Sequence, residues 1–224
     1  MLIDYFLRGG WVMWPILGAS IVALAVVLNR LLYFLRTRGE PADLVREVLR
    51  LVDERRLADA RTRCAASRIP SAAVLEAGLS AWGLSQEEVE RRMEQAASDQ
   101  MAAAEARLPM LASMVAVLPM LGFLGTILGL IEAFGAWAAA GASVSIEQLA
   151  HGIEEAMITT AGGLLTSIPY VLAYNAFSAA TARVARSLNS AASELAGRHC
   201  ARDGEESKAP APVSVLSVGA GGSR

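Results

Sequence analysis

Three long apolar stretches, separated by polar segments, set the pattern of the chain. They lie at residues 9–35, 108–134 and 153–182, and each contains an uncharged run long enough for a helix to cross the roughly 30 Å hydrocarbon core of a bilayer. The first stretch begins with Trp11 and Trp14, as expected for aromatic side chains at a membrane interface. The pattern predicts an all-α integral membrane protein with three transmembrane helices.

The first stretch has an alternative interpretation, a cleavable signal peptide, because the Ala-Leu-Ala sequence at residues 23–25 resembles a cleavage site. Asp4, however, offsets the charge of Arg8 before the apolar run, and the run continues beyond residue 25 as far as Arg30. We therefore favour a membrane span that is retained.

The third stretch has two different faces when it is drawn as a helix with about 100° per residue. One face carries Met, Ile, Leu and Val side chains, and the other carries hydroxyls, small residues and one carboxylate. The polar face comprises Glu155, Thr159, Thr160, Gly162, Gly163, Thr166, Ser167, Pro169, Tyr170 and Tyr174. Because lipid solvates hydroxyls poorly, this face should pack on other helices, line a pore, or do both.

A stripe of small residues follows the second stretch. On an ideal helix, Pro119, Gly122, Gly129 and Ala133 fall within about 60° of Thr126. Gly125 and Gly129 also form a GxxxG pair, a pattern that lets helices approach closely. We expect this stripe to lie against the polar face of the third stretch.

The polar segment at 36–107 predicts a small helical insert followed by a longer helix. Three short helices are expected, one containing Leu44, Val48, Leu51 and Val52 at helical spacing, the others at 57–66 and 71–82. Ser85 and Glu88 have the spacing of a capping box. Because no Gly or Pro occurs from Gln86 to Leu108, this helix should run on into the second span, with kinks at Pro109 and Pro119.

Positive charges are distributed unevenly. Arg8 is the only basic residue before the first span, thirteen lie from Arg30 to Arg107, and none lies from 108 to 182. Cytoplasmic segments beside membrane spans are enriched in Lys and Arg. The sequence therefore predicts an outer N-terminus at 1–8, a cytoplasmic insert at 36–107, an outer loop at 135–152, a cytoplasmic helix extension at 183–202 and a disordered Pro, Gly and Ser-rich tail at 203–224.

Composition agrees with a membrane protein, since 54% of the residues are hydrophobic and the mean hydropathy is +0.40. Thirteen acidic residues balance the thirteen basic ones from Arg30 to Arg107, which argues against a nucleic-acid-binding surface. Cys64 and Cys200 both fall in segments expected in the cytoplasm, where thiols stay reduced. Neither is expected to form a structural disulfide.

The sequence offers no arrangement typical of an enzyme, a metal centre or a cofactor site. His151 and His199 are expected on opposite sides of the membrane, and neither an HExxH pair nor a phosphate-binding loop occurs. Glu155, at the outer end of the polar face, is a functional candidate, with Glu154 as its solvated neighbour. No carboxylate lies deep in any span. Since hydroxyls do not titrate near neutral pH, another chain must supply the acid if this protein moves protons.

Two long motifs resemble the MotA/TolQ/ExbB proton-channel family, and most closely its three-span ExbB and TolQ members. LGFLGTILGLIEAF at 121–134 is similar to the family's LGLLGTVxGMxxAF, and GIEEAMITTAGGLLTSIPYVLAYN at 152–175 is similar to GIxEALxATAxGLxxAIPAxxxYN. The topology and the helical insert are also similar to those of the family.

The resemblance implies a pentamer in the bacterial inner membrane. Its second and third spans would line a pore that holds two copies of a single-span partner, ExbD or TolR, whose aspartate carries the proton. Proton flow would drive movement of a periplasm-spanning protein similar to TonB or TolA. The alternatives are a structural scaffold without ion conduction, and sodium in place of protons.

By the same resemblance, an ion path is expected at Thr126, Thr160 and Glu155. Thr159, where the family usually has Ala, adds a hydroxyl to that path. The glycines and the proline of the two motifs are expected to pack in the pore wall. These are Gly122, Gly125, Gly129, Gly163 and Pro169.

Overall fold

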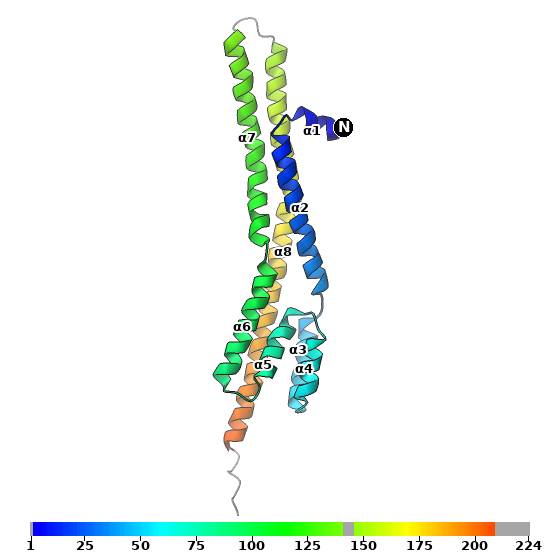
Figure 1. The fold of residues 1–224 in the computed structure, drawn as a ribbon, viewed down its shortest axis with the longest axis vertical. Helices are drawn as coiled ribbons and strands as arrows, with labels where there is room; N and C mark the ends of the chain where they lie inside the picture. The colour runs from blue at the N-terminus through cyan, green and yellow to red at the C-terminus, as the bar shows by residue number, and fades with distance from the viewer. Residues whose placement is uncertain (1, 141–145, 209–224) are drawn as a thin grey trace, which may run out of the picture.

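The computed structural model describes residues 2–140 and 146–208, and these form an elongated set of helices (Figure 1). In chain order the helices are α1 (Leu2–Arg8), α2 (Met13–Arg36), α3 (Pro41–Asp53), α4 (Leu57–Ala65), α5 (Pro70–Ser80), α6 (Gln86–Glu105), α7 (Leu108–Ala140) and α8 (Ile146–Lys208). Three segments of the described chain are helical, long and apolar enough to cross a membrane. The predicted all-α membrane protein with three spans is confirmed.

The helices form two packed regions along the length of α8. In one region, α7 runs beside α8 and α2 lies against both of them. In the other, α5 and α6 pack on the C-terminal half of α8, with α3 and α4 beside α5 (Figure 1). The short helix α1 projects sideways from the start of α2. The membrane spans and the helical insert are therefore joined through one continuous helix, α8.

The insert has a dense apolar core. Val48, Leu75, Met93 and Leu195, from four different helices, are each at most 2% exposed. In water, complete burial of one such side chain stabilises the fold by about 1.5–3 kcal/mol. The core confirms the amphipathic short helices predicted for this segment, and it fixes the insert on the end of α8.

The three spans share a narrower core and expose large apolar side chains on their outer faces. Leu111, Leu118 and Ala23 are fully buried between the spans, whereas Phe123 is 63% and Leu165 is 70% exposed. Such exposure suits lipid or neighbouring protein chains and does not suit water.

The predicted helix through residues 86–134 is wrong at one point, because the chain breaks between α6 and α7. Arg107 has φ 65°, α6 ends at Glu105, and α7 begins at Leu108. Pro109 lies in the first turn of α7, where it has no N–H to donate and its ring would clash with a continuing helix. Pro109 therefore marks a helix start and not a kink.

A side chain from another helix caps the broken end of α6. Arg30 is 2% exposed, and its guanidinium donates to Ala103 O at 3.2 Å and Ala104 O at 2.6 Å. Thr181 Oγ1 of α8 also donates to Ala104 O, at 3.3 Å. These donors satisfy carbonyls that a helix end would otherwise leave unpaired, so the break is stabilised by tertiary contacts.

Other helix ends also differ from the predictions. α7 continues to Ala140 and α8 begins at Ile146, so most of the predicted outer loop at 135–152 is helical, consistent with its alanine content. α8 continues to Lys208, six residues into the predicted tail, and residues 209–224 lie outside the described chain. At Ser85, Oγ accepts from Glu88 N at 3.4 Å, whereas the Glu88 carboxylate binds Arg91 and Arg92.

Candidate functional site

Glycines of α7 and α8 lie in direct contact. A Cβ atom on Gly163 would lie 2.8 Å from Leu118 O and 2.9 Å from Gly122 Cα, and one on Gly122 would lie 3.2 Å from Thr160 O. Distances below about 3 Å leave no room for a side chain, so the backbones themselves touch here. The predicted packing of the small-residue stripe against the polar face of the third span is confirmed.

The same contact continues toward the C-terminal end of α7 and the N-terminal end of α8. Gly125 lies against the Thr159 side chain, and a Cβ on Gly129 would lie 3.0 Å from Ala156 Cβ. Four of the five residues expected to pack in the pore wall therefore lie in this helix contact. The fifth, Pro169, is exposed, so the single chain gives it no buried packing role.

The hydroxyls of Thr126 and Thr160 meet beside the glycine contact. They are hydrogen-bonded to each other, and both approach Gly122 O, Thr160 Oγ1 at 3.0 Å and Thr126 Oγ1 at 3.4 Å. Each hydroxyl has a single proton, so the pair can make only two of these three hydrogen bonds at a time. One hydroxyl can therefore rotate and donate to another group while the other hydroxyl still donates to Gly122 O.

Thr159 contacts α7 through its methyl group, beside Gly125, whereas its hydroxyl is directed to other partners. It is 2% exposed, and its hydroxyl lies 2.6 Å from Gly9 O and 2.9 Å from Glu155 O, so its single proton is shared between these two carbonyls. These contacts attach α8 to the turn between α1 and α2. Within one chain, the Thr159 hydroxyl therefore faces that turn and not the Thr126–Thr160 pair.

Glu155 approaches the same turn. Gly10 has φ +69°, and a Cβ atom there would overlap with the Glu155 carboxylate. Gly10 is therefore required both by its backbone conformation and by the space that the carboxylate occupies. The neighbouring Glu154 pairs with Arg8, whose side chain is 54% exposed, and such an exposed pair contributes little to stability.

Two further residues of the polar face bind the first span or their own helix. Tyr170 Oη donates to Ser20 O at 2.9 Å and lies 2.8 Å from Ser20 Oγ, which joins α8 to α2. Ser167 Oγ donates to Leu164 O at 2.8 Å, within α8. The polar face is thus divided among α7, α2 and the α1–α2 turn, a division that helical spacing alone does not reveal.

The described chain offers no convergent set of metal ligands, since no group of three His, Cys, Asp or Glu residues within it is placed to hold an ion. His151 and His199 lie on one helix, 48 positions apart, which at 1.5 Å per residue is about 72 Å. The two imidazoles therefore act in separate environments.

Sequence reasoning missed three groups at this site. These are the Gly9–Gly10 turn, the Arg30 cap and the Tyr170–Ser20 contact. The adjacent glycines before the first apolar run were the available signal for the turn, since paired glycines indicate a tight backbone conformation. The other two groups pair positions 73 and 150 residues apart, and no local pattern indicates such contacts.

Comparison with known proteins identifies similar sequences. Residues 66–190 match the sequence profile of the MotA/TolQ/ExbB proton channel family, a segment that covers more than half of the chain and includes Thr126, Thr160 and the glycine contact. The α1–α2 turn lies outside it.

Three similar relatives carry transport or Tol-Pal names. The putative biopolymer transport protein ExbB-like 1 of Synechocystis is 35% identical over 180 residues, which is 77% of this chain and 69% of that protein. The Tol-Pal system protein TolQ of Haemophilus influenzae is 40% identical over 88 residues, 39% of this chain and 38% of that protein. The biopolymer transport protein ExbB of Xanthomonas campestris is 35% identical over 107 residues, which is 48% of this chain and 42% of that protein. The matched segments thus span less than half of the latter two proteins.

Proposed function

This chain belongs to the MotA/TolQ/ExbB proton channel family, and from that premise we propose that it is the pore-forming subunit of an ion-driven motor in the inner membrane. Five copies would surround two copies of a single-span partner similar to ExbD or TolR. Proton flow through the assembly would perform work on a periplasm-spanning protein similar to TonB or TolA. The observation that carries the proposal is the Thr126–Thr160 hydroxyl pair at the α7–α8 contact.

The two hydroxyls suit a relay and do not suit a proton carrier. A threonine hydroxyl donates one hydrogen bond and accepts others, but it does not ionise near neutral pH. No Asp or Glu lies between residues 108 and 131 or between 156 and 182. The partner's aspartate would therefore hold the proton, and Thr126 and Thr160 would hydrate that aspartate and pass its proton along.

Glu155 would act at the outer end of the path. Its carboxylate lies beside Gly10 at the α1–α2 turn, five residues before Thr160 on the same helix. A carboxylate at the edge of a span attracts cations to the membrane surface. We propose that Glu155 attracts the ion. Thr159, through its hydrogen bond to Gly9 O, would hold the part of α8 that contains Glu155 against the α1–α2 turn.

The exposed apolar faces support an assembly of several chains. Phe123 and Ile131 on α7 are each 63% exposed, and Leu165 on α8 is 70% exposed. Lipid would cover the outer part of these faces, and neighbouring copies would cover the remainder. The energy available is about 2.3 kcal/mol for each charge that crosses 100 mV, enough to drive conformational change when several protons pass.

A substitution of Thr160 tests the relay. Thr160→Val keeps the shape of the side chain and removes the hydroxyl, so we expect proton flux to fall by about 100-fold or more, as for loss of a proton-transfer group. Flux should be measured with a pH-sensitive dye in liposomes that contain this chain and its co-expressed single-span partner. Thr160→Ser, which retains the hydroxyl, serves as the matched control.

The alternative function is a structural scaffold in which the polar residues only pack helices. In that case liposomes with Thr160→Val and liposomes with Thr160→Ser would show the same proton flux. That flux would be no higher than in empty liposomes. Normal flux with Thr160→Val would remove the hydroxyl pair from the path.

A further inference from the structure

A pocket of about 640 Å³ lies between α1, α2 and α8. Met13 and Leu17 of α2 form one wall, and Ala161, Gly162 and Leu165 of α8 form the other. Ala161 and Leu165 are also exposed, so the pocket opens onto the surface of the third span. Since Ala161 and Gly162 are small, this wall leaves space for a larger apolar side chain.

The pocket is continuous with an apolar stripe on α8. Projected at about 100° per residue, the exposed side chains of the stripe fall within about 100° of the helix circumference. They are Met157, Ala161, Leu164, Leu165, Ile168 and Leu172. On the same face, Arg183 and Arg186 follow the third apolar stretch and are exposed. One face of α8 therefore changes from apolar to basic where the span ends.

α7 carries a matching apolar stripe on the side opposite its own contact with α8. The exposed side chains of this stripe recur every three or four residues. They are Met120, Phe123, Ile127, Ile131 and Phe134. On an ideal helix they lie opposite Gly122, Gly125 and Gly129, which contact α8 of the same chain. An apolar face opposite a packed face is suited to packing on a neighbouring chain.

Phe123 lies at the height of the pocket. α7 and α8 run antiparallel and side by side (Figure 1), and Gly125 lies against Thr159. Phe123 precedes Gly125 by two residues, and Ala161 follows Thr159 by two, so Phe123 and Ala161 are level. Copies related by rotation about an axis normal to the membrane lie at one height. Phe123 of one copy is therefore level with the pocket of the next.

Opposite charges also match in height, at the end of the spans that adjoins the insert. Thr181 Oγ1 of α8 donates to Ala104 O of α6, which makes these two residues level. Glu105 follows Ala104 by one residue, and Arg183 follows Thr181 by two. Because the two helices are antiparallel, Glu105 and Arg183 are about 4.5 Å apart along the helix axes, at 1.5 Å per residue.

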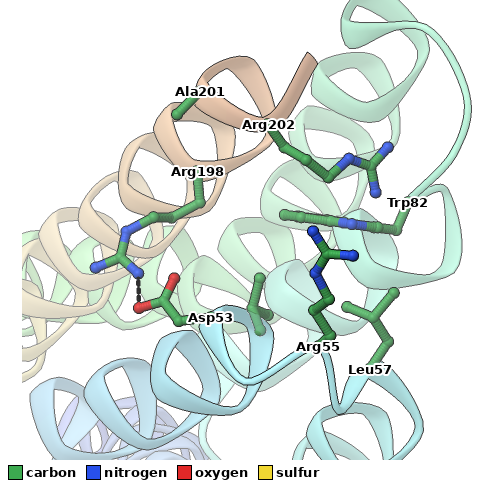
Figure 2. Close-up of a pocket in the computed structure, with 8 residues that line it drawn as sticks. Asp53, Arg55, Leu57, Trp82, Arg198, Ala201 and Arg202 are labelled. Carbon is green, nitrogen blue, oxygen red and sulfur yellow. Dashed lines mark hydrogen bonds and ion pairs between the residues drawn. The ribbon is translucent and has the colours of Figure 1, made fainter. Parts of the chain in front are cut away.

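Glu105 and Arg183 are exposed, and neither forms an ion pair within the described part of the chain. Farther along α8, in contrast, Arg198 pairs with Asp53 of its own chain (Figure 2). Glu105 is also the last residue of α6, where the helix dipole disfavours a negative charge. Side chains tilt toward the N-terminus of their own helix, so Glu105 and Arg183 tilt toward each other. A neighbouring copy would supply each charge with an opposite one.

We propose that Phe123 of one copy fills the pocket between α1, α2 and α8 of the next copy, and that Glu105 faces Arg183 across the same boundary. The inference rests on the proposed ring of copies and identifies the surfaces that would close it. Each α7 would have its own α8 on one side and the neighbour's α8 on the other, so the contact repeats head to tail. A lipid chain in the pocket would leave both charges unmatched, which favours a second copy as the occupant.

Photo-cross-linking tests the occupant of the pocket. The photoreactive aromatic amino acid p-benzoylphenylalanine replaces Phe123, and membranes that contain this chain and its co-expressed single-span partner are irradiated. We expect covalent dimers of this chain, with the link mapped by peptide mass spectrometry to residues 13–17 or 158–166 of the second copy. Adducts with lipid alone, links to the single-span partner, or links to other segments of this chain would overturn the proposal.

A control position shows whether the links are specific. Met110 is exposed on α7 and lies about 100° around the helix from the apolar stripe. The same photoreactive residue in place of Met110 should not link to the pocket. Equal linking from both positions would mean that the α7 stripe has no defined place on the neighbouring copy.

Substitutions of Phe123 test whether its side chain stabilises the assembly. Phe123→Ala should raise the protein concentration at which the oligomer dissociates in detergent by about tenfold or more, because buried aromatic side chains dominate many interfaces. Phe123→Leu keeps an apolar side chain and should have a smaller effect, and Met110→Ala should have none. Light scattering over a dilution series measures the dissociation. An unchanged dissociation of Phe123→Ala would contradict the proposed contact.

A charge exchange tests the second contact. Glu105→Arg and Arg183→Glu should each raise the dissociation concentration by about fivefold or more, and the double variant should recover most of the loss. Asp99→Arg is the control, because Asp99 is an exposed acid on α6 about 120° around the helix from Glu105. Failure of the double variant to recover would show that the two charges do not face each other.

The parent protein separates failure of this interface from failure of the proposed function. A parent chain that stays monomeric at every concentration would refute the proposed ring itself. A parent oligomer that none of these substitutions weakens would refute only the interface inferred here.

Discussion

Burial raises the pKa of the Cys64 thiol from 9.0 to about 11, and the nearby Glu76 carboxylate acts in the same direction. Cys64 is 1% exposed in the core of the insert, whereas Cys200 on α8 is exposed. The thiolate is the reactive form of cysteine. The two thiols are chemically identical, but their different burial gives them different reactivity.

Iodoacetamide at pH 8 should therefore modify Cys200 and leave Cys64 unmodified, because Cys64 is both inaccessible and protonated. Intact mass spectrometry should show one adduct in the folded protein and two after denaturation. Cys200→Ser is the control and should show none until the protein unfolds. Rapid modification of Cys64 in that variant would contradict the buried position.

The same pKa shift predicts a pH dependence of stability. The folded state binds the Cys64 proton more tightly than the unfolded chain does. Stability therefore decreases as the pH rises through the range in which the thiol is ionised in the unfolded chain but still protonated in the folded protein. The contribution of this thiol is complete below about pH 9 and is lost as the pH rises from about 9 to 11. Cys64→Ala should remove this part of the alkaline decline in Tm.

At the scale of the helix, the capped break between α6 and α7 depends on Arg30. Its side chain extends from α2 to α6, where it donates to Ala103 O and Ala104 O. Its guanidinium carbon lies 4.5 Å from the centre of the Tyr33 ring. Arg30→Met should cost about 2–4 kcal/mol of unfolding free energy, because buried carbonyls lose their donors.

Hydrogen exchange and thermal unfolding would measure this effect. Amides at residues 100–107 should exchange faster in Arg30→Met, and Tm should fall. Arg36→Met removes an exposed arginine from the same helix and should change neither quantity. Unchanged exchange in Arg30→Met would mean that Thr181 and Pro109 hold the break without Arg30.

The helices that could be predicted from sequence are those specified by local patterns. Long uncharged apolar stretches predict all three spans, apolar periodicity predicts the short helices of the insert, and the stripe at Gly122 and Thr126 indicates its partner on α8. The break at Arg107 was missed because a residue more than 70 positions away caps it. Helical spacing places Thr159 on the polar face, but spacing alone does not show that its hydroxyl is hydrogen-bonded to Gly9 O.

At the scale of the whole molecule, α8 connects the proposed ion path with the insert. Thr160 and Leu195 lie 35 residues apart on this helix, about 52 Å at 1.5 Å per residue. Leu195 is fully buried in the core of the insert, so the same helix is packed in both regions. We expect the insert to move with the third span and not independently of it.

The proposed orientation places the insert in the cytoplasm and the α7–α8 ends in the periplasm, because thirteen of the 20 basic residues lie from Arg30 to Arg107. Single cysteines at two exposed positions, Gly135→Cys on α7 and Glu90→Cys on α6, test this in a Cys200→Ser background. A membrane-impermeant maleimide added to intact spheroplasts should label position 135 and should label position 90 only after lysis. The positive-inside rule concerns charges beside the spans, so the reverse labelling would place Arg30, Arg36 and Arg38 outside and would overturn the direction of ion flow as well as the topology.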